Sequence, residues 1–489
     1  MYRCVRSAAT VILGLLAGAW TSFGAAQSVR APAAAPNAHR YLSVDPAGFM
    51  GTLSDSGRVE THSAFFESLG SNKRSCATCH TLNAALGLSL DDVRARFLRT
   101  QGTDPLFVPF DGANCPEDAQ GIPASHSLLL SYGLIRVGIP MPASAEFTVS
   151  VVHDPYGCAI APDPTTGVPT VSVYRRPLPA TNLRFLSAVM WDGRETPDGL
   201  TSATTFAASL FTDLAHQATD ATLGHEQAAA PPTQEQLASI VKFELGLTSA
   251  QVFDFSAGAL QSAGALGGPA SLARQPYEPG INDSLGASFN PAAMTLYAAW
   301  QSSHRIAARA DIAAGEKLFD SAPMTITDVR GLNDNQSLGS PATLTATCTS
   351  CHDAPNVGDH SAPLPLDIGM AHSLLPGFET DPNVIAGLRE LAPPDLPVYL
   401  FAGCPDPFNP GHAAPIYTTD PGRALITGKC ADLNRVKGPI LRALAARAPY
   451  FHNGSAATLQ QVVNFYNKRF QMRLTHRQVD QLAAFLASL

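Results

Sequence analysis

The feature that most constrains this chain is a five-residue motif that occurs twice. Residues 76–80 read Cys-Ala-Thr-Cys-His, and residues 348–352 read Cys-Thr-Ser-Cys-His. Cysteines at this spacing place their thiols on one turn of helix, where they can add to the two vinyl groups of a haem. The next histidine can then bind the iron. The sequence therefore predicts two covalently attached haem c groups. The attachment cysteines and proximal histidines would be Cys76, Cys79 and His80 in the first motif, and Cys348, Cys351 and His352 in the second.

Two other kinds of site also use a Cys-x-x-Cys pair. Paired motifs of this kind bind zinc, but a histidine directly after the second cysteine fits zinc spacing poorly. A thioredoxin-like redox pair requires a βαβ context, which the sequence lacks. Haem attachment therefore remains the preferred interpretation.

The N-terminus has the pattern of a secretory signal. Within residues 1–26, Arg3 and Arg6 precede an apolar run that ends near small residues suited to cleavage. An uncleaved N-terminal anchor is the alternative interpretation. No later apolar run approaches about 18 residues, so we expect a periplasmic protein without a membrane span.

The nine cysteines cannot all pair with one another. Cys4 would leave with the signal, and four cysteines belong to the two motifs. Export permits disulfides among the remaining four, for which three connectivities are possible. We prefer pairing between near neighbours, namely Cys115–Cys158 and Cys404–Cys430.

Composition excludes two other classes of protein. Hydrophobic residues make up 45% of the 489 residues and charged residues 15%, which is not the composition of a disordered chain. The formal net charge of −8 leaves no basic excess for binding nucleic acid.

Two further segments resemble the bacterial di-haem cytochrome c peroxidase / MauG family. Residues 191–194 read Trp-Asp-Gly-Arg, and residues 448–454 read Ala-Pro-Tyr-Phe-His-Asn-Gly. The resemblance covers most of the mature chain, with residues 81–190 covered least. It implies an N-terminal haem with an open side that reacts with hydrogen peroxide, and a six-coordinate C-terminal haem that relays electrons.

We expect a mainly α fold made of two cytochrome-c-like haem domains with long loop insertions. After the signal peptide, residues 27–56 would form an N-terminal extended arm. Residues 57–300 would form the peroxidatic haem domain, and residues 308–489 the electron-transfer haem domain.

Local patterns place several elements within these domains. Helical signals occur at residues 182–191, 232–252 and 475–489, and before the second motif at residues 313–319. Residues 147–152 read as a strand.

The resemblance assigns the second axial ligand of the C-terminal haem to Tyr466. In the peroxidases this ligand is a methionine 14 residues after the histidine of the 448–454 segment, and counting from His452 leads to Tyr466. MauG-type members carry tyrosine there, and the match resembles a BthA-like branch. Helical periodicity alone favours a packed core tyrosine, while Met370 and Met472 are weaker candidates for the ligand. A phenolate is hard and anionic, so this haem should have a low reduction potential.

The resemblance also suggests catalytic residues. Trp191 matches a tryptophan between the haems that would relay electrons, although a packed core tryptophan is the alternative. The position of the family's peroxide-site glutamate holds Gln227, which cannot take up a proton. His225, two residues earlier, can serve as acid/base near neutral pH, with Glu226 and His216 nearby.

The family also binds calcium between the haems. The matching backbone carbonyls here belong to Arg447 and Pro449, but the asparagine position holds Arg176. Its positive charge would repel the ion, so bound calcium is doubtful.

These observations predict a periplasmic di-haem c peroxidase of MauG-like type. Hydrogen peroxide would react at the N-terminal haem, and oxidising equivalents would be shared with the Tyr466-ligated haem. Electrons would come from a small redox protein (a cytochrome c or a cupredoxin) or from a protein substrate. The alternatives are a non-catalytic electron-transfer cytochrome, with His126 or His153 capping the first haem, and a di-haem oxygenase.

Overall fold

The structure is a computed structural model that describes most of the chain. The described residues are 40–163, 166–196, 203–275, 294–303, 305–352, 365–375, 382–409, 411–412 and 415–489. The expected signal peptide and the first part of the expected arm lie outside these residues. None of the described helices combines the length and apolar character needed to cross a bilayer.

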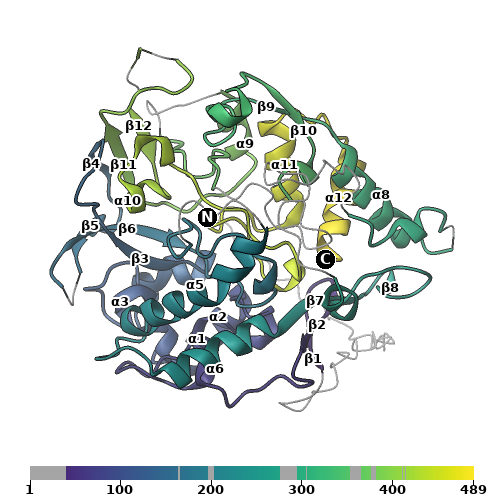
Figure 1. The fold of residues 1–489 in the computed structure, drawn as a ribbon, viewed down its shortest axis with the longest axis horizontal. Coiled ribbons are helices and arrows are strands. Elements are labelled where there is room, and N and C mark those ends of the chain that lie inside the picture. Colours follow the sequence, from purple (N-terminus) through teal and green to yellow (C-terminus); the bar gives the residue numbers. More distant parts are fainter. Residues whose placement is uncertain are drawn as a thin grey trace, which may run out of the picture.

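The prediction of a mainly α fold is wrong, because the described residues form four antiparallel sheets as well as helices (Figure 1). The helices are α1 (Cys76–Cys79), α2 (Leu90–Thr100), α3 (Pro109–Gly112), α4 (Ser127–Tyr132), α5 (Ala203–Gly224), α6 (Gln234–Leu245), α7 (Pro269–Ala273), α8 (Ala307–Ser321), α9 (Pro382–Leu388), α10 (Ala424–Thr427), α11 (Leu459–Arg469) and α12 (His476–Ala487). The fold is therefore mixed α/β.

Two sheets lie wholly in the N-terminal half of the chain. The first has the order β1 (Arg40–Val44), β2 (Gly48–Ser54), β7 (Leu247–Asp254) and β8 (Gly258–Ala259). Strands β1 and β2 belong to the expected arm and pair with each other, so this part of the arm is a β-hairpin. The second sheet has the order β3 (Ile135–Pro140), β6 (Pro169–Arg175) and β5 (Ile160–Pro162).

A third sheet joins segments from both halves of the chain. It has the order β12 (Ile416–Thr418), β11 (Val398–Ala402) and β4 (Thr148–His153), which lie together in Figure 1. Its core combines Phe147 and Val171 with Tyr399 and Phe401. A fourth, two-stranded sheet pairs β9 (Met324–Ile326) with β10 (Leu344–Ala346). The third sheet therefore crosses the expected boundary near residue 300.

Apart from β4, the strands were not predicted, and the reason is physical. Residues 170–175 of β6 are all buried, so this strand lacks the alternation of apolar and polar residues that marks a half-buried strand. Strands β4 and β11 are separated by more than 200 residues, and no local pattern reveals such a pairing.

Most of the locally predicted elements are confirmed. Helices α8 and α12 and strand β4 lie where the sequence predicted them. The predicted helix at residues 232–252 ends at Leu245, and β7 follows it. Residues 182–191 contain only a short 3₁₀ turn at Leu183–Phe185, so that prediction is wrong. Both preferred disulfides, Cys115–Cys158 and Cys404–Cys430, are present.

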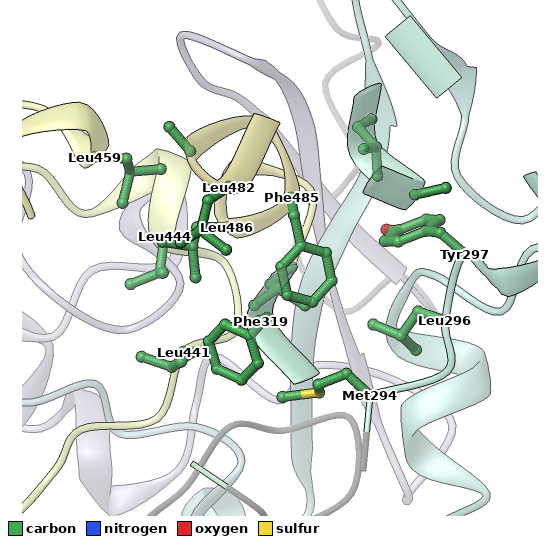
Figure 2. Packing of buried hydrophobic residues seen from close by; sticks show 14 of the residues in the cluster. Met294, Leu296, Tyr297, Phe319, Leu441, Leu444, Leu459, Leu482, Phe485 and Leu486 are labelled. Atoms are coloured by element: carbon green, nitrogen blue, oxygen red, sulfur yellow. The ribbon is translucent and has the colours of Figure 1, made fainter. Parts of the chain in front are cut away.

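The largest apolar core brings α8, α11 and α12 together beside the second motif. Phe319 of α8 and Phe485 of α12 meet edge to face, with ring centroids 5.5 Å apart (Figure 2). Helix α8 approaches α12 closely at Gly315, where a Cβ atom would lie 2.0 Å from the backbone oxygen of Gln481. A glycine is therefore required at this crossing.

Candidate functional site

Helix α1 presents the first cysteine pair. Its N-terminus is closed by a reciprocal cap, in which the backbone nitrogen of Ser75 donates to Oγ1 of Thr78 at 3.0 Å. Cys76 and Cys79 are both free thiols on this single turn. His80 follows, and its Nδ1 donates to the carbonyl oxygen of Leu86 at 3.0 Å. That bond leaves Nε2 available for a metal, and burial lowers the pKa of His80, which favours the neutral imidazole that binds iron.

The second motif repeats this local design. The backbone nitrogen of Thr347 donates to Oγ of Ser350 at 3.0 Å, and Cys348 and Cys351 are free thiols. The backbone nitrogen of His352 donates to the carbonyl oxygen of Cys348 at 2.8 Å. The same kind of cap therefore opens both motifs, which continue as an α-helical turn in the first and a 3₁₀ turn in the second.

Each motif faces its own cavity. The N-terminal cavity encloses about 1300 Å³ of space and is lined by Cys76, Cys79 and His80. The C-terminal cavity encloses about 1640 Å³ and is lined by residues 348, 351 and 352 of the second motif. Most other lining side chains are aliphatic or aromatic, as the flat apolar face of a porphyrin requires.

Buried cations in the cavity walls provide a second test of this fit. Arg176 lines both cavities and is 5% exposed, and Arg447 lines the C-terminal cavity. The guanidinium of Arg176 donates to the carbonyl oxygens of Tyr132, Leu88 and Arg447. Among the described residues, neither arginine has a carboxylate partner, and burying such a charge is costly. Two propionate carboxylates of a haem would supply the missing anions, so thiols, imidazoles and cations together fit haem.

Trp191 lies in the wall that the two cavities share. The shared lining residues are Arg176, Pro177, Leu178, Pro179, Trp191 and Lys437. Trp191 is 8% exposed, and its Nε1 donates to the carbonyl oxygen of Arg176 at 2.7 Å. Its ring centroid is 6.0 Å from that of His452. The structure thus places an aromatic ring between the two candidate haem sites.

A buried ion network holds the turn that follows Trp191. Asp192 pairs with Arg175 at 2.5 Å and with Arg194 at 2.8 Å. Arg175 also pairs with Asp420 at 2.6 Å, which ties this turn to the C-terminal half. Burial would raise the pKa of Asp192, but Arg194 and Arg175 hold it at about 2.

The N-terminal cavity carries an acid/base candidate at one end. His225 lines this cavity, and its Nδ1 lies 2.5 Å from Oδ2 of Asp111. Asp111 is buried and paired with the buried guanidinium of Arg74, which keeps the pKa of Asp111 below its ordinary value despite burial. The Asp111 carboxylate accepts a hydrogen bond from the Nδ1–H group of His225. The other ring nitrogen, Nε2, is then the one that can accept a proton. Sequence reasoning missed Asp111 and Arg74, because no motif marks either of them.

Of the other candidates near His225, Glu226 also lines the cavity, whereas Gln227 and His216 do not. Gln227 accepts a hydrogen bond from Nδ2 of Asn72 at 3.2 Å and is not among the residues that line the cavity. Glu226 lines the cavity, but its Oε2 accepts from the backbone nitrogen of Leu69 at 2.9 Å. His216 pairs with Glu195 and is largely exposed. The structure therefore brings His225, and not Gln227, to the cavity.

The C-terminal cavity gathers all three candidates for a second axial ligand. Tyr466, Met370 and Met472 all line it. Tyr466 packs against Phe465 and Phe470, with ring centroids 5.3 Å and 5.9 Å away, and burial raises its pKa. Among the described residues no hydrogen bond to its hydroxyl is seen, although buried tyrosine hydroxyls usually have a partner.

The histidines proposed to cap the first haem are committed elsewhere. His126 is buried, with Nδ1 donating to the carbonyl oxygen of Gly112 at 2.7 Å, and His153 pairs with Asp395 at 2.7 Å. Neither lines the N-terminal cavity.

Comparison with known proteins adds an independent observation. No family model matches the chain. It is 33% identical over 128 residues to the cytochrome-c peroxidase IdrP2 of Denitromonas iodatirespirans, covering 25% of this chain and 28% of that protein. It is 38% identical over 78 residues to the cytochrome c551 peroxidase of Nitrosomonas europaea, covering 15% of this chain and 23% of that protein. Over part of its length, the chain is homologous to bacterial cytochrome c peroxidases.

These alignments span about a quarter of the length of each cytochrome c peroxidase. Among solved structures, a hydrazine synthase of Kuenenia stuttgartiensis aligns over 82% of this chain and 93% of that chain. Its TM-score is 0.28 and the sequence identity is 14%, so no relationship of fold follows.

At the calcium position expected from the peroxidase resemblance, the guanidinium of Arg176 binds one of the expected ligand oxygens. The carbonyl oxygen of Arg447, one of the expected ligands, accepts a hydrogen bond from Arg176 at 3.0 Å. Burial and the neighbouring Arg447 lower the pKa of Arg176 to about 9, which still leaves it charged at neutral pH.

We therefore expect calcium removal to have no effect on the protein. Dialysis against EGTA should leave the haem spectra and the rate of peroxide reduction unchanged, because a fixed cation already binds the carbonyl oxygen of Arg447. The rate of peroxide reduction is measured before chelation, after chelation, and again after calcium is restored. A loss of activity that calcium alone restores would contradict this expectation.

Proposed function

We propose that this protein is a periplasmic di-haem c peroxidase of MauG-like type. Hydrogen peroxide would be reduced in the N-terminal cavity, where His80 would hold a haem, and Trp191 would relay oxidising equivalents to a second haem held in the C-terminal cavity. The observation that carries this proposal is the pair of motif-bearing cavities with Trp191 in their common wall. Partial homology to cytochrome c peroxidases supports the same function.

The proposed chemistry assigns a role to each group in the N-terminal cavity. His80 would hold a haem iron through Nε2, and the bound haem supplies the centre that exchanges electrons with peroxide. His225 takes a proton from one peroxide oxygen at Nε2 and delivers it to the other, so that the departing oxygen leaves as water. Asp111 keeps the Nδ1 proton in place, and Arg74 keeps Asp111 ionised.

In the C-terminal cavity we propose that Tyr466 would be the second protein ligand to the iron of a haem that His352 would also hold. A ligand role accounts for a tyrosine that lines the cavity and whose hydroxyl has no hydrogen bond among the described residues. The phenolate would favour the more oxidised states of the iron and keep its reduction potential low. This choice corresponds to the MauG-type, BthA-like arrangement.

Reducing equivalents enter from outside the chain. The electron donor would be a small redox protein, either a cytochrome c or a cupredoxin, or the oxidisable residues of a protein substrate. Peroxide reduction takes two electrons and two protons and yields two molecules of water, so the donor is oxidised twice in each turnover.

Peroxide titration of the diferric protein tests this function. We expect a near-infrared charge-resonance band in the wild type, because oxidising equivalents shared by two haems give such a transition. In Trp191→Phe we expect the band to be lost, since phenylalanine is much harder to oxidise than tryptophan and cannot relay charge between the cavities.

Ferric electron paramagnetic resonance provides the control for both proteins. A high-spin signal shows that one haem has an open side, whereas its absence would indicate a simple electron carrier. Slow bleaching of the wild type without any intermediate would contradict the proposed function.

A further inference from the structure

Glu244 is a buried acid in the N-terminal cavity that the peroxidase chemistry above does not use. It is the penultimate residue of α6, lines the cavity and is 5% exposed. Its Oε2 is buried without a hydrogen-bond partner among the described residues. Leaving a buried polar group unsatisfied is costly, so such a group calls for an explanation.

Among the described residues, Glu244 forms no ion pair with any of the cations that line this cavity. Burial raises the pKa of the Cys76 thiol of α1, and Glu244 and Glu226 lie close enough to raise it further. The residues that α5 contributes to the same cavity, Gln217, Ala218 and Ala221, are all uncharged. Phe65, which precedes α1, packs in the same apolar cluster as α6 residues.

The other charged groups that line this cavity have partners of their own. Arg176 donates to the carbonyl oxygens of Tyr132, Leu88 and Arg447, and Lys437 donates to that of Gly438. Arg74 is engaged by Asp111, and Asp111 also holds His225. Arg175 and Arg194 are held by Asp192. Glu226 accepts the backbone hydrogen of Leu69. Once a haem is attached, Cys76 becomes a thioether and no longer titrates, so Glu244 is the unpartnered acid beside it.

Burial alone raises the pKa of Glu244 to about 8. At neutral pH the carboxyl group is therefore mostly protonated, and a modest change in the local electrostatic potential is enough to ionise it. Electron transfer at a haem in the same cavity is such a change, because charges interact strongly where water is excluded.

We propose that Glu244 takes up a proton when the haem of the N-terminal cavity gains an electron and releases it when that haem is oxidised. This inference rests on the proposed peroxidase function. During turnover, protonated Glu244 gives one of the two protons that convert peroxide and two electrons into two waters. The carboxylate that remains takes a proton from solvent when the donor protein reduces the haem again, which restores the starting state.

The pH dependence of the reduction potential tests this coupling in the holoprotein. Between about pH 6 and 9, the potential of the N-terminal haem should fall as pH rises, because the oxidised state releases the proton first. One proton per electron corresponds to a tenfold change in the equilibrium for each pH unit, which is at most about 59 mV per pH unit. In Glu244→Gln we expect this slope to fall by more than half.

Glu226→Gln is the matched control, because it removes a second carboxyl group near Cys76 that already has a backbone partner. Its slope should match that of the wild type. A wild-type slope in Glu244→Gln, or a slope lost only in Glu226→Gln, would overturn the proposal. The measurement uses no peroxide, so a protein that keeps the Glu244-dependent slope but fails to reduce peroxide refutes only the peroxidase function.

Infrared difference spectroscopy of the wild type gives a second readout that needs no Glu244 variant. We expect the C=O stretch of a protonated carboxylic acid to gain intensity on reduction of the N-terminal haem and to persist in Glu226→Gln. The absence of any such band on reduction would reject the assignment even if Glu244→Gln failed to load haem.

Discussion

In His225→Ala, we expect the rate constant for peroxide reduction to fall by roughly 100- to 10,000-fold, the usual contribution of a positioned acid/base group. The His225 side chain lines the N-terminal cavity, with Nδ1 tied to the buried Asp111–Arg74 pair. Alanine removes the only histidine besides His80 that lines this cavity among the described residues. Stopped-flow mixing of the variant with peroxide measures the loss.

Gln227→Ala is the control for this prediction. Its side chain contacts Asn72 outside the cavity lining, so the rate constant should stay close to that of the wild type. Haem content and the ferric spectra of both variants show whether each protein is correctly loaded. A near-normal rate in His225→Ala with a large loss in Gln227→Ala would return the acid/base role to the position that the peroxidase resemblance indicates.

Tyr466→Met should raise the reduction potential of the C-terminal haem by roughly 0.2–0.4 V, since axial ligands tune haem potentials over about 0.8 V. A thioether is soft and stabilises the ferrous iron, whereas a phenolate is anionic and stabilises the ferric iron. The expected loss of stored oxidising equivalents should also abolish the near-infrared band. Spectroelectrochemical titration of wild type and variant measures the shift.

The two methionines of the same cavity supply the controls. Met370→Leu and Met472→Leu conserve apolar volume, so each should leave the potential of the C-terminal haem nearly unchanged. A clearly positive potential in the wild type that drops in Met370→Leu or Met472→Leu would identify that methionine as the ligand. Tyr466 would then be a packed core residue.

Local patterns predicted the parts of the site that depend on neighbouring residues. The two motifs are read directly from the sequence, and both disulfides match the preferred pairing of near neighbours. Helix α12 was equally clear, because its apolar residues recur at helical spacing over three turns. The sheets were missed, since β4 meets β11 only through a contact between distant segments.

The same limit applied inside the N-terminal cavity. Asp111 belongs to the segment covered least by the family resemblance, and its contact with His225 spans 114 residues. Glu244 reads as an ordinary helical glutamate in the sequence, and only the packing of α6 against α5 and the first motif makes it buried.

The sequence by itself therefore determined the local chemistry of the two motifs, namely which thiols and imidazoles are presented and how many times. That chemistry depends on residues three or four positions apart, and such spacings survive in any fold that keeps the local turn. Only the tertiary structure decided which groups surround each motif, including the shared Trp191 wall, the Asp111–His225 pair and the unpartnered Glu244. Burial and charge pairing arise from contacts between distant segments, and those contacts set the protonation of the site.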